Sequence, residues 1–443
     1  MKLQLSDHFT AGRLLRFSMP SIVMMIFTSI YGVVDGIFVS NFAGKVPFAA
    51  INLIMPYIMA VGSFGFMIGT GGTALISKTL GMGDKKKANE IFSMLSWVCI
   101  LMGAVLTALS MVFLRPAAVF FGAEGEMLEC CVAYGLIVLP ASVAYILQFA
   151  YQSFCVTAEK ANLSLVMTVV SGVCNIVLDG LFVAAFNWGL VGAAVATAVS
   201  QVVGAVIPLV YFSRPNSSLL RLGKFRFDSS ALVRTLTNGS SELLSNLSMS
   251  LVGMLYNLQL MNYAGEDGIA AYGVIMYVNL FFLSVFIGFS IGSAPLIGYN
   301  HGADNRAELK SITQKSLILL VLSSLAMTGS ALLLAKPLAA VFVGYDPVLM
   351  EMTVRGFFIY SLSFLFSGLN IFASSMFTAL NNGLVSAVIS FVRTLVCQVA
   401  AVLLLPLIWE LDGIWWSVVA AELVALVLAA ILFVALRKRY HYA

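Results

Sequence analysis

Charged side chains are scarce in this sequence. Only 10% of its 443 residues are Asp, Glu, Lys or Arg, whereas a soluble domain carries about 25%. Hydrophobic residues make up 60% of the chain, and the mean hydropathy is +0.99. These values exclude an ordinary soluble domain and predict a protein that lies in a lipid bilayer and has no nucleic-acid partner.

Motifs for catalysis and metal binding are absent as well. The three histidines lie in predicted loops or tails, and the six cysteines show no spacing typical of a disulfide framework or a zinc site. The sequence contains no Walker A loop, no GxSxG and no HExxH. We therefore predict that the protein is not an enzyme, has no cofactor and does not use ATP.

Long apolar runs fill nearly the whole chain instead. A helix needs about 20 mostly apolar residues to cross the hydrocarbon layer, which predicts an all-α polytopic membrane protein with twelve transmembrane helices. We place the crossings near residues 14–39, 48–77, 88–114, 130–155, 162–186, 189–213, 232–264, 269–298, 311–334, 353–380, 384–408 and 413–437.

The basic residues alternate between the predicted loops. About 19 Lys and Arg residues lie at the two termini and in every second loop, and about 4 lie in the loops between, which hold most of the loop acids. Because basic loops stay in the cytoplasm, we predict a multi-pass protein of the cell (inner) membrane with both termini cytoplasmic. An even number of crossings meets this requirement.

The sequence repeats itself at an offset of 221 residues. Asn41, Ala43 and Gly44 align with 262, 264 and 265, and Trp188, Leu190 and Gly192 align with 409, 411 and 413. Gly81 likewise aligns with Gly302. Chance matches between two apolar halves are common, but chance does not keep one register through six consecutive spans.

The repeat predicts two pseudo-symmetric six-helix bundles in parallel orientation. We divide the chain into an amino-terminal lobe (1–213), a cytoplasmic linker (214–231) and a carboxy-terminal lobe (232–443), and we expect a monomer. Parallel repeats related by an axis along the membrane normal are typical of transporters, in which access alternates as the lobes rock.

Four polar side chains fall at one depth in the first lobe. Asp35 lies nine residues before Gly44, and Asp179 lies nine residues before Trp188, so both are roughly 13 Å below the rim. Thr197 reaches a similar depth, and Asn175 lies one turn below Asp179 on the same helix face. Two carboxylates in one low-dielectric cavity do not easily stay ionised together, which predicts a proton carrier. The same oxygens also suit Na⁺. The alternative is that the two acids only hold helices together.

The second lobe does not repeat these acids. At the offset of 221, Tyr256 replaces Asp35, an alanine replaces Asp179, and Glu422 replaces a glutamine. The candidate polar groups of this lobe are Tyr256, Asn257, Glu242, Arg393 and Glu422. We interpret Glu242 as a first-turn acid of the seventh helix. Arg393 and Glu422 lie mid-span in the eleventh and twelfth helices, where an ion pair would be structural or functional.

Four segments together resemble the multidrug and toxic compound extrusion (MATE) transporters over essentially the whole chain. These segments are MPSIVMMIFTSIYGVVDGIFVSNFAG, NIVLDGLFV, WGLVGAAVATAVSQ and PLIGYNHGADN. The resemblance implies twelve helices in two six-helix bundles and export of cationic amphiphilic drugs, coupled to inward flow of H⁺ or Na⁺.

Several residues match the family's functional motifs. Asp35 matches the acid of the first helix, and Pro20 matches the proline whose bend is linked to protonation in some members. Asn175 and Asp179 match the NxxxD of the fifth helix, and Thr197 matches the hydroxyl of the sixth. One branch of the family is expected to carry a further acid on the seventh helix; that register gives Met249 here, which puts a second-lobe Na⁺ site in doubt.

The sequence predicts a secondary antiporter whose lobes rock, and the resemblance to MATE transporters implies that it exports cationic amphiphilic drugs or toxins. Asp35 and Asp179 couple export to inward H⁺, with Na⁺ as the alternative ion. A second hypothesis is a flippase of a lipid-linked saccharide, which would need several deep basic residues for the pyrophosphate; only Arg393 lies deep. A third is a non-transporting scaffold or enzyme, for which no extramembrane domain is visible.

Overall fold

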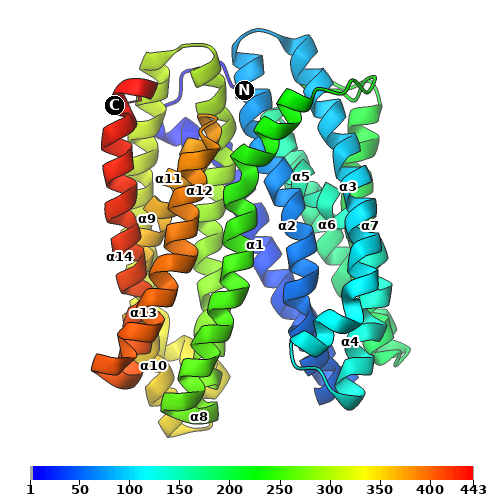
Figure 1. Cartoon of the computed structure of the whole chain (residues 1–443), viewed down its shortest axis with the longest axis vertical. Helices are drawn as coiled ribbons and strands as arrows, with labels where there is room; N and C mark the ends of the chain where they lie inside the picture. The colour runs from blue at the N-terminus through cyan, green and yellow to red at the C-terminus, as the bar shows by residue number, and fades with distance from the viewer. Residues whose placement is uncertain (1–2, 443) are drawn as a thin grey trace.

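Every element of secondary structure in the computed structural model is helical (Figure 1). The structure describes residues 3–442. The first half contains α1 (Ala11–Phe38), η1 (Val39–Ala43), α2 (Lys45–Gly81), α3 (Lys85–Phe120), α4 (Gly125–Val138), η2 (Leu139–Ala141), α5 (Ser142–Thr157), α6 (Ala161–Asp179), η3 (Gly180–Ala185) and α7 (Gly189–Ser213). The second half contains α8 (Ser229–Gly302), α9 (Arg306–Val343), α10 (Pro347–Ser361), α11 (Phe364–Ala379), α12 (Gly383–Phe391), η4 (Val392–Cys397), α13 (Gln398–Leu404) and α14 (Pro406–Tyr440).

These elements make twelve crossings, which confirms the predicted fold class. Ten helices are long and apolar enough to span a membrane, and the pair α10 and α11, bent by 46°, forms one more. The twelfth comes from α8, whose 74 residues are broken at Gly265 (φ 63°, ψ −149°). Only glycine adopts such a backbone conformation readily, so α8 runs down one side of the molecule and returns (Figure 1). A similar break at Glu410 begins the last crossing within α14.

The crossings form two lobes, the N-lobe (α1–α7) and the C-lobe (α8–α14), joined by an irregular linker. The linker ends at Asp228 rather than at residue 231, because the Asp228 side chain accepts a hydrogen bond from the Ala231 N–H and starts α8 earlier. Both chain termini and the linker lie at one end of the molecule, which we call the basic end (Figure 1).

The lobes pack together through α1 and α2 against α8. A Cβ atom added to Gly81 would lie 2.0 Å from the carbonyl oxygen of Tyr299, and one added to Gly302 would lie 2.0 Å from that of Lys78. The offset of 221 maps each of these contacts onto the other, so the sequence repeat is also the symmetry of the interface. A second close approach joins Gly239 to Met67. Such backbone contacts between membrane helices need glycine.

Hydrogen bonds also join the two lobes, beginning at the basic end. The first segment of the chain crosses to the C-lobe, where Glu308 accepts from the Phe9 N–H at 2.8 Å and contacts His8 Nδ1 at 2.7 Å. Lys315 Nζ donates to the Phe9 carbonyl. Along α1, the farthest cross-lobe hydrogen bonds in the described chain are those of Ser29 with Ser284 and with the Leu280 carbonyl. The lobes are therefore fastened from the basic end as far along α1 as Ser29.

Candidate functional site

The structure brings the four predicted polar residues of the N-lobe together. The Asp35 side chain, from the end of α1, lies against those of Asp179 and Asn175 on α6. Thr197, on α7, lies near the Tyr134 hydroxyl, which is also close to both acids. Asp179 is fully buried and Asn175 is 3% exposed, while Asp35 and Thr197 are half-buried.

The helices widen at the two acids. The π-helical turn η1 follows α1 four residues after Asp35, and η3 begins directly after Asp179. Each acid is followed by glycine in the sequences DGIFV and DGLFV. π-Helical turns break the regular hydrogen-bond ladder and are frequent at functional sites. The shared Asp-Gly-apolar-Phe-Val pattern is the sequence signal for this local geometry.

The acid pair has no positively charged partner. No ion pair among residues 3–442 involves Asp35 or Asp179. Asp35 Oδ1 and both carboxyl oxygens of Asp179 are buried and receive no hydrogen bond from a fixed donor in the described chain. Burying an unpaired charge costs roughly several kcal/mol, even after the surrounding protein has relaxed. The contact between the two carboxyl groups becomes a hydrogen bond once one of them carries a proton, so this arrangement calls for a proton or another cation.

Two tyrosines, Tyr31 and Tyr134, lie near the acid pair, a third lies behind them, and none was predicted from the sequence. Tyr31 lies one turn before Asp35 on α1 and faces it. Tyr134, on α4, is 1% exposed, and Tyr145, on α5, lies near Tyr31 and Tyr134. Only the i, i+4 spacing of Tyr31 and Asp35 could have been read from the sequence, because the other two come from distant helices.

Pro20 lies away from the acids, in the part of α1 that packs on α8. The helix continues from Ala11 to Phe38 through this proline. A Cβ atom on Gly288 would lie 2.5 Å from the Ile22 Cα, and one on Gly292 would lie 2.7 Å from the Ser18 Cα. Pro20 therefore belongs to the lobe interface in this structure.

In the C-lobe, the position equivalent to Asp35 is occupied by a neutral hydrogen-bonded pair. The Tyr256 hydroxyl donates to Gln398 Oε1 at 2.8 Å, and Tyr256 is 3% exposed. Asn257, the next residue, is exposed and does not join this pair. The equivalent of the acid pair is thus uncharged in the C-lobe.

The remaining C-lobe candidates lie around Arg393. Its guanidinium pairs with Glu422, with Nη2 to Oε1 at 2.7 Å, and Glu242 also faces it. The interpretation of Glu242 as a first-turn acid is wrong. The helix α8 starts at Ser229, so Glu242 lies more than three turns inside it. The polar run before Glu242, which suggested a loop, is already helical.

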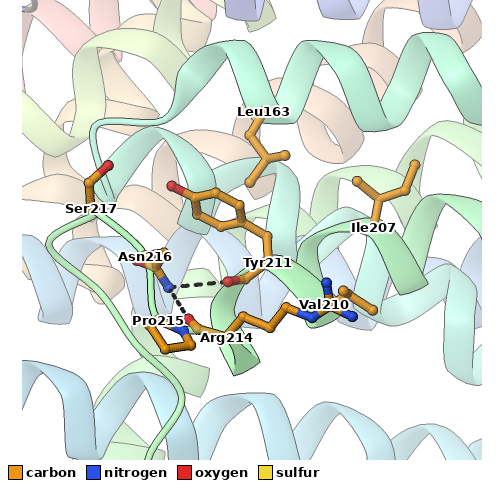
Figure 2. A pocket seen from close by; sticks show the side chains of 8 residues that line it. All are labelled: Leu163, Ile207, Val210, Tyr211, Arg214, Pro215, Asn216 and Ser217. Carbon is orange, nitrogen blue, oxygen red and sulfur yellow. Dashed lines mark hydrogen bonds between the residues drawn. The ribbon is translucent and has the colours of Figure 1, made fainter.

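Two shallow pockets lie at the basic end, far from the acid pair along the helices. One, of about 480 Å³, lies between α6, α7 and the linker; Figure 2 shows that Arg214 and Asn216 border it on the linker side and Leu163 and Ile207 on the helix side. The other, of about 550 Å³, is bordered by Lys87 and Arg226. Neither includes a predicted site residue.

Comparison with known proteins agrees with this architecture. The MatE family profile matches residues 20–181 and again 243–403, once in each lobe. The chain belongs to the MatE family. MatE family members are transporters and not enzymes, which confirms the predicted class of protein.

Among relatives of this MatE protein, the multidrug export protein MepA of Staphylococcus saprophyticus is 26% identical over 433 residues, covering 96% of this chain and 94% of MepA. MepA of Staphylococcus aureus strain NCTC 8325 is 23% identical, with the same coverage. Among solved structures, an outward-facing multidrug resistance MATE transporter superposes with a TM-score of 0.91 at 22% identity, covering 98% of both chains. A Vibrio cholerae MATE transporter gives 0.89 at 21% identity and the same coverage.

Proposed function

We propose that this protein is a secondary antiporter that exports cationic amphiphilic drugs or toxins across the cell membrane in exchange for inward H⁺. The single observation that carries the proposal is the buried Asp35–Asp179 pair, which has two carboxyl groups in contact and no fixed cation. Such a site is stable only when it holds a proton or another positive charge. A proton and a cationic drug can therefore replace one another in the N-lobe.

The packing of the lobes supports alternating access. With the basic end in the cytoplasm, as the distribution of Lys and Arg indicates, the fastened interface separates Asp35 from the cytoplasm. Asp35 lies six residues beyond Ser29, the last cross-lobe hydrogen bond along α1, or roughly 9 Å farther from the cytoplasm. In this outward-facing state a proton reaches the pair and releases the drug. Rocking of the lobes then exposes the pair to the cytoplasm.

The energetics suffice for concentrative export. A pH difference of one unit supplies about 1.4 kcal/mol per proton, which supports roughly a ten-fold drug gradient. The membrane potential adds about 2.3 kcal/mol per 100 mV only for each inward proton in excess of the charge that the drug carries out. Na⁺ is the alternative ion, because the oxygens of Asp35, Asp179, Asn175 and Thr197 are hard ligands. MepA, named as a multidrug exporter, supports the drug as cargo. Lipid-linked saccharides fit less well, since Arg393, the deep basic residue, is already paired with Glu422.

Proteoliposomes with separately imposed pH and Na⁺ gradients test this function. A lipophilic cation, ethidium, should be driven by an inward pH gradient at equal Na⁺, and the Asp35→Asn protein should fail to concentrate it. Ethidium transport driven by the Na⁺ gradient alone would show that Na⁺, and not H⁺, is the coupling ion. Ethidium accumulation by Asp35→Asn that equals the wild type would refute coupling at this pair.

A further inference from the structure

The C-lobe holds a largely buried arginine in bidentate contact with a buried carboxylate. Arg393 lies on the π-helical turn η4 and Glu422 lies on α14. Arg393 Nε is 2.9 Å from both carboxylate oxygens of Glu422, and Nη2 is 2.7 Å from Oε1. The side chains are 15% and 5% exposed. A buried pair of this kind is screened little by salt, and its geometry matches the planar guanidinium fork.

A third residue completes the coordination of Glu422. Asn370, fully buried on α11, donates from Nδ2 to Oε2 of Glu422 at 2.7 Å and to its backbone carbonyl at 2.9 Å. Both carboxylate oxygens of Glu422 therefore receive fixed donors. The oxygens of Asp179 in the N-lobe receive none in the described chain.

Other ionisable groups approach this pair without supplying a second positive charge. Glu242, from α8, lies near Arg393 without forming an ion pair with it, and Tyr360, from α10, lies near both Arg393 and Glu422. Tyr256, from α8, faces Glu422. Among the described residues, the C-lobe cluster thus contains two acids and one permanent cation.

The two lobes differ in how their buried carboxyl groups are neutralised. Each places two carboxyl groups inside the membrane, but only the C-lobe provides a covalently attached cation. At the offset of 221, Arg393 maps onto Gly172 and Glu422 maps onto Gln201. Gly172 packs against the rings of Phe27 and Tyr31 and leaves no room for a longer side chain. A cation has therefore to come from outside in the N-lobe.

We propose that Arg393 is a tethered counter-ion that keeps Glu422 charged and so prevents the C-lobe from taking up an exchangeable proton or cation. The proposal rests on the proposed function, because it explains why exchange is confined to the Asp35–Asp179 pair. An arginine side chain stays protonated in proteins. It moves with the C-lobe in both states of the transport cycle, so no ion is carried across the membrane at Glu422. Arg393 thereby sets the number of ions exchanged per drug.

Labelling of the whole wild-type protein in detergent tests the charge state directly. The hydrophobic reagent dicyclohexylcarbodiimide adds to protonated carboxylic acids, and the resulting N-acylurea is located by peptide mass spectrometry. Glu422 should stay unlabelled in the wild type and in Arg393→Lys, and should become labelled in Arg393→Gln. Labelling of Glu422 in the wild type would overturn the proposal. Labelling of Asp35 or Asp179 would show that the N-lobe pair carries a proton, which tests the proposed function. These residues lie on other peptides than Glu422, so the two results are read separately.

A second experiment measures the number of protons exchanged per drug molecule. In proteoliposomes, the slope of the steady-state ethidium gradient against the imposed pH difference gives the number of protons per drug. In Arg393→Gln, one added proton should steepen the gradient by about ten-fold per pH unit, and the double variant Arg393→Gln/Glu422→Gln should return it to the wild-type slope. A double variant with fewer protons than the wild type would show that Glu422 itself exchanges protons. An unlabelled Glu422 and an unchanged slope in Arg393→Gln would show that Arg393 is only structural. Either result would refute the proposal.

Discussion

Adding one methyl group to either of two glycines should open the basic end of the transporter. A Cβ atom at Gly81 or at Gly302 would lie 2.0 Å from a carbonyl oxygen of the other lobe. Ordinary contact begins near about 3.5 Å, so the backbones must separate by roughly 1.5 Å. Overpacking of this kind costs about 1–3 kcal/mol. This shifts the equilibrium away from the packed state seen in the structure by roughly 5- to 150-fold.

The two substitutions should act alike, because the pseudo-symmetry makes the contacts equivalent. Gly81→Ala and Gly302→Ala should each lengthen the distance between spin labels at Met82 and Asp304, measured by double electron–electron resonance after replacement of the six native cysteines. The double variant should fall short of the sum, since one methyl group already separates the same surfaces. Gly329→Ala is the matched control, because nothing lies within 4 Å of its Cβ.

A wild-type distance distribution and a wild-type rate of ethidium transport in Gly81→Ala or Gly302→Ala would refute this reasoning. A large effect at one glycine and none at the other would show that the interface is not symmetric in energy. Gly329→Ala should be neutral or raise thermal stability by up to about 1 kcal/mol, because alanine favours a helix interior.

Two further predictions concern Glu308 and Glu159, whose side chains hold the segment before α1. Glu308→Ala removes the acceptor of the buried Phe9 N–H and the partner of His8, and should lower the free energy of unfolding by about 1–3 kcal/mol; an unchanged melting temperature would contradict it. Burial raises the pKa of Glu159, a loop residue that accepts from the Leu5 N–H. The folded state then binds this proton more tightly, so its contribution to stability should be lost as the pH rises from 4.5, the usual pKa, through the raised value. Glu159→Gln should flatten that part of the stability curve, and an identical curve would exclude this role.

The fold was predictable because membrane crossings depend on local composition. Twelve apolar runs, alternating loop charge and one repeat offset were enough to give the number of crossings and the two bundles. The depth of Asp35 and Asp179 followed from counting residues back from the turns at Gly44 and Trp188, since helices have a constant rise.

The rest depends on which helix faces meet, and one sequence does not fix this. Tyr134 comes close to the acid pair from α4, Tyr145 lies behind it on α5, and nothing in their spacing indicates this arrangement. Glu242 was misplaced because a run of small polar residues resembles a loop but is helical when it packs between lobes. The pairing of Arg393 with Glu422 was an open alternative until the geometry of η4 and α14 was known.

Coupling at the Asp35–Asp179 pair is tested most directly by the slope of the ethidium gradient against the imposed pH difference. The measurement compares wild-type, Asp35→Asn and Asp267→Asn proteins in proteoliposomes; Asp267 is an exposed acid two residues after the break of α8 at Gly265. The account predicts equal slopes for the wild type and Asp267→Asn and a flat line for Asp35→Asn. A wild-type slope in Asp35→Asn would contradict it.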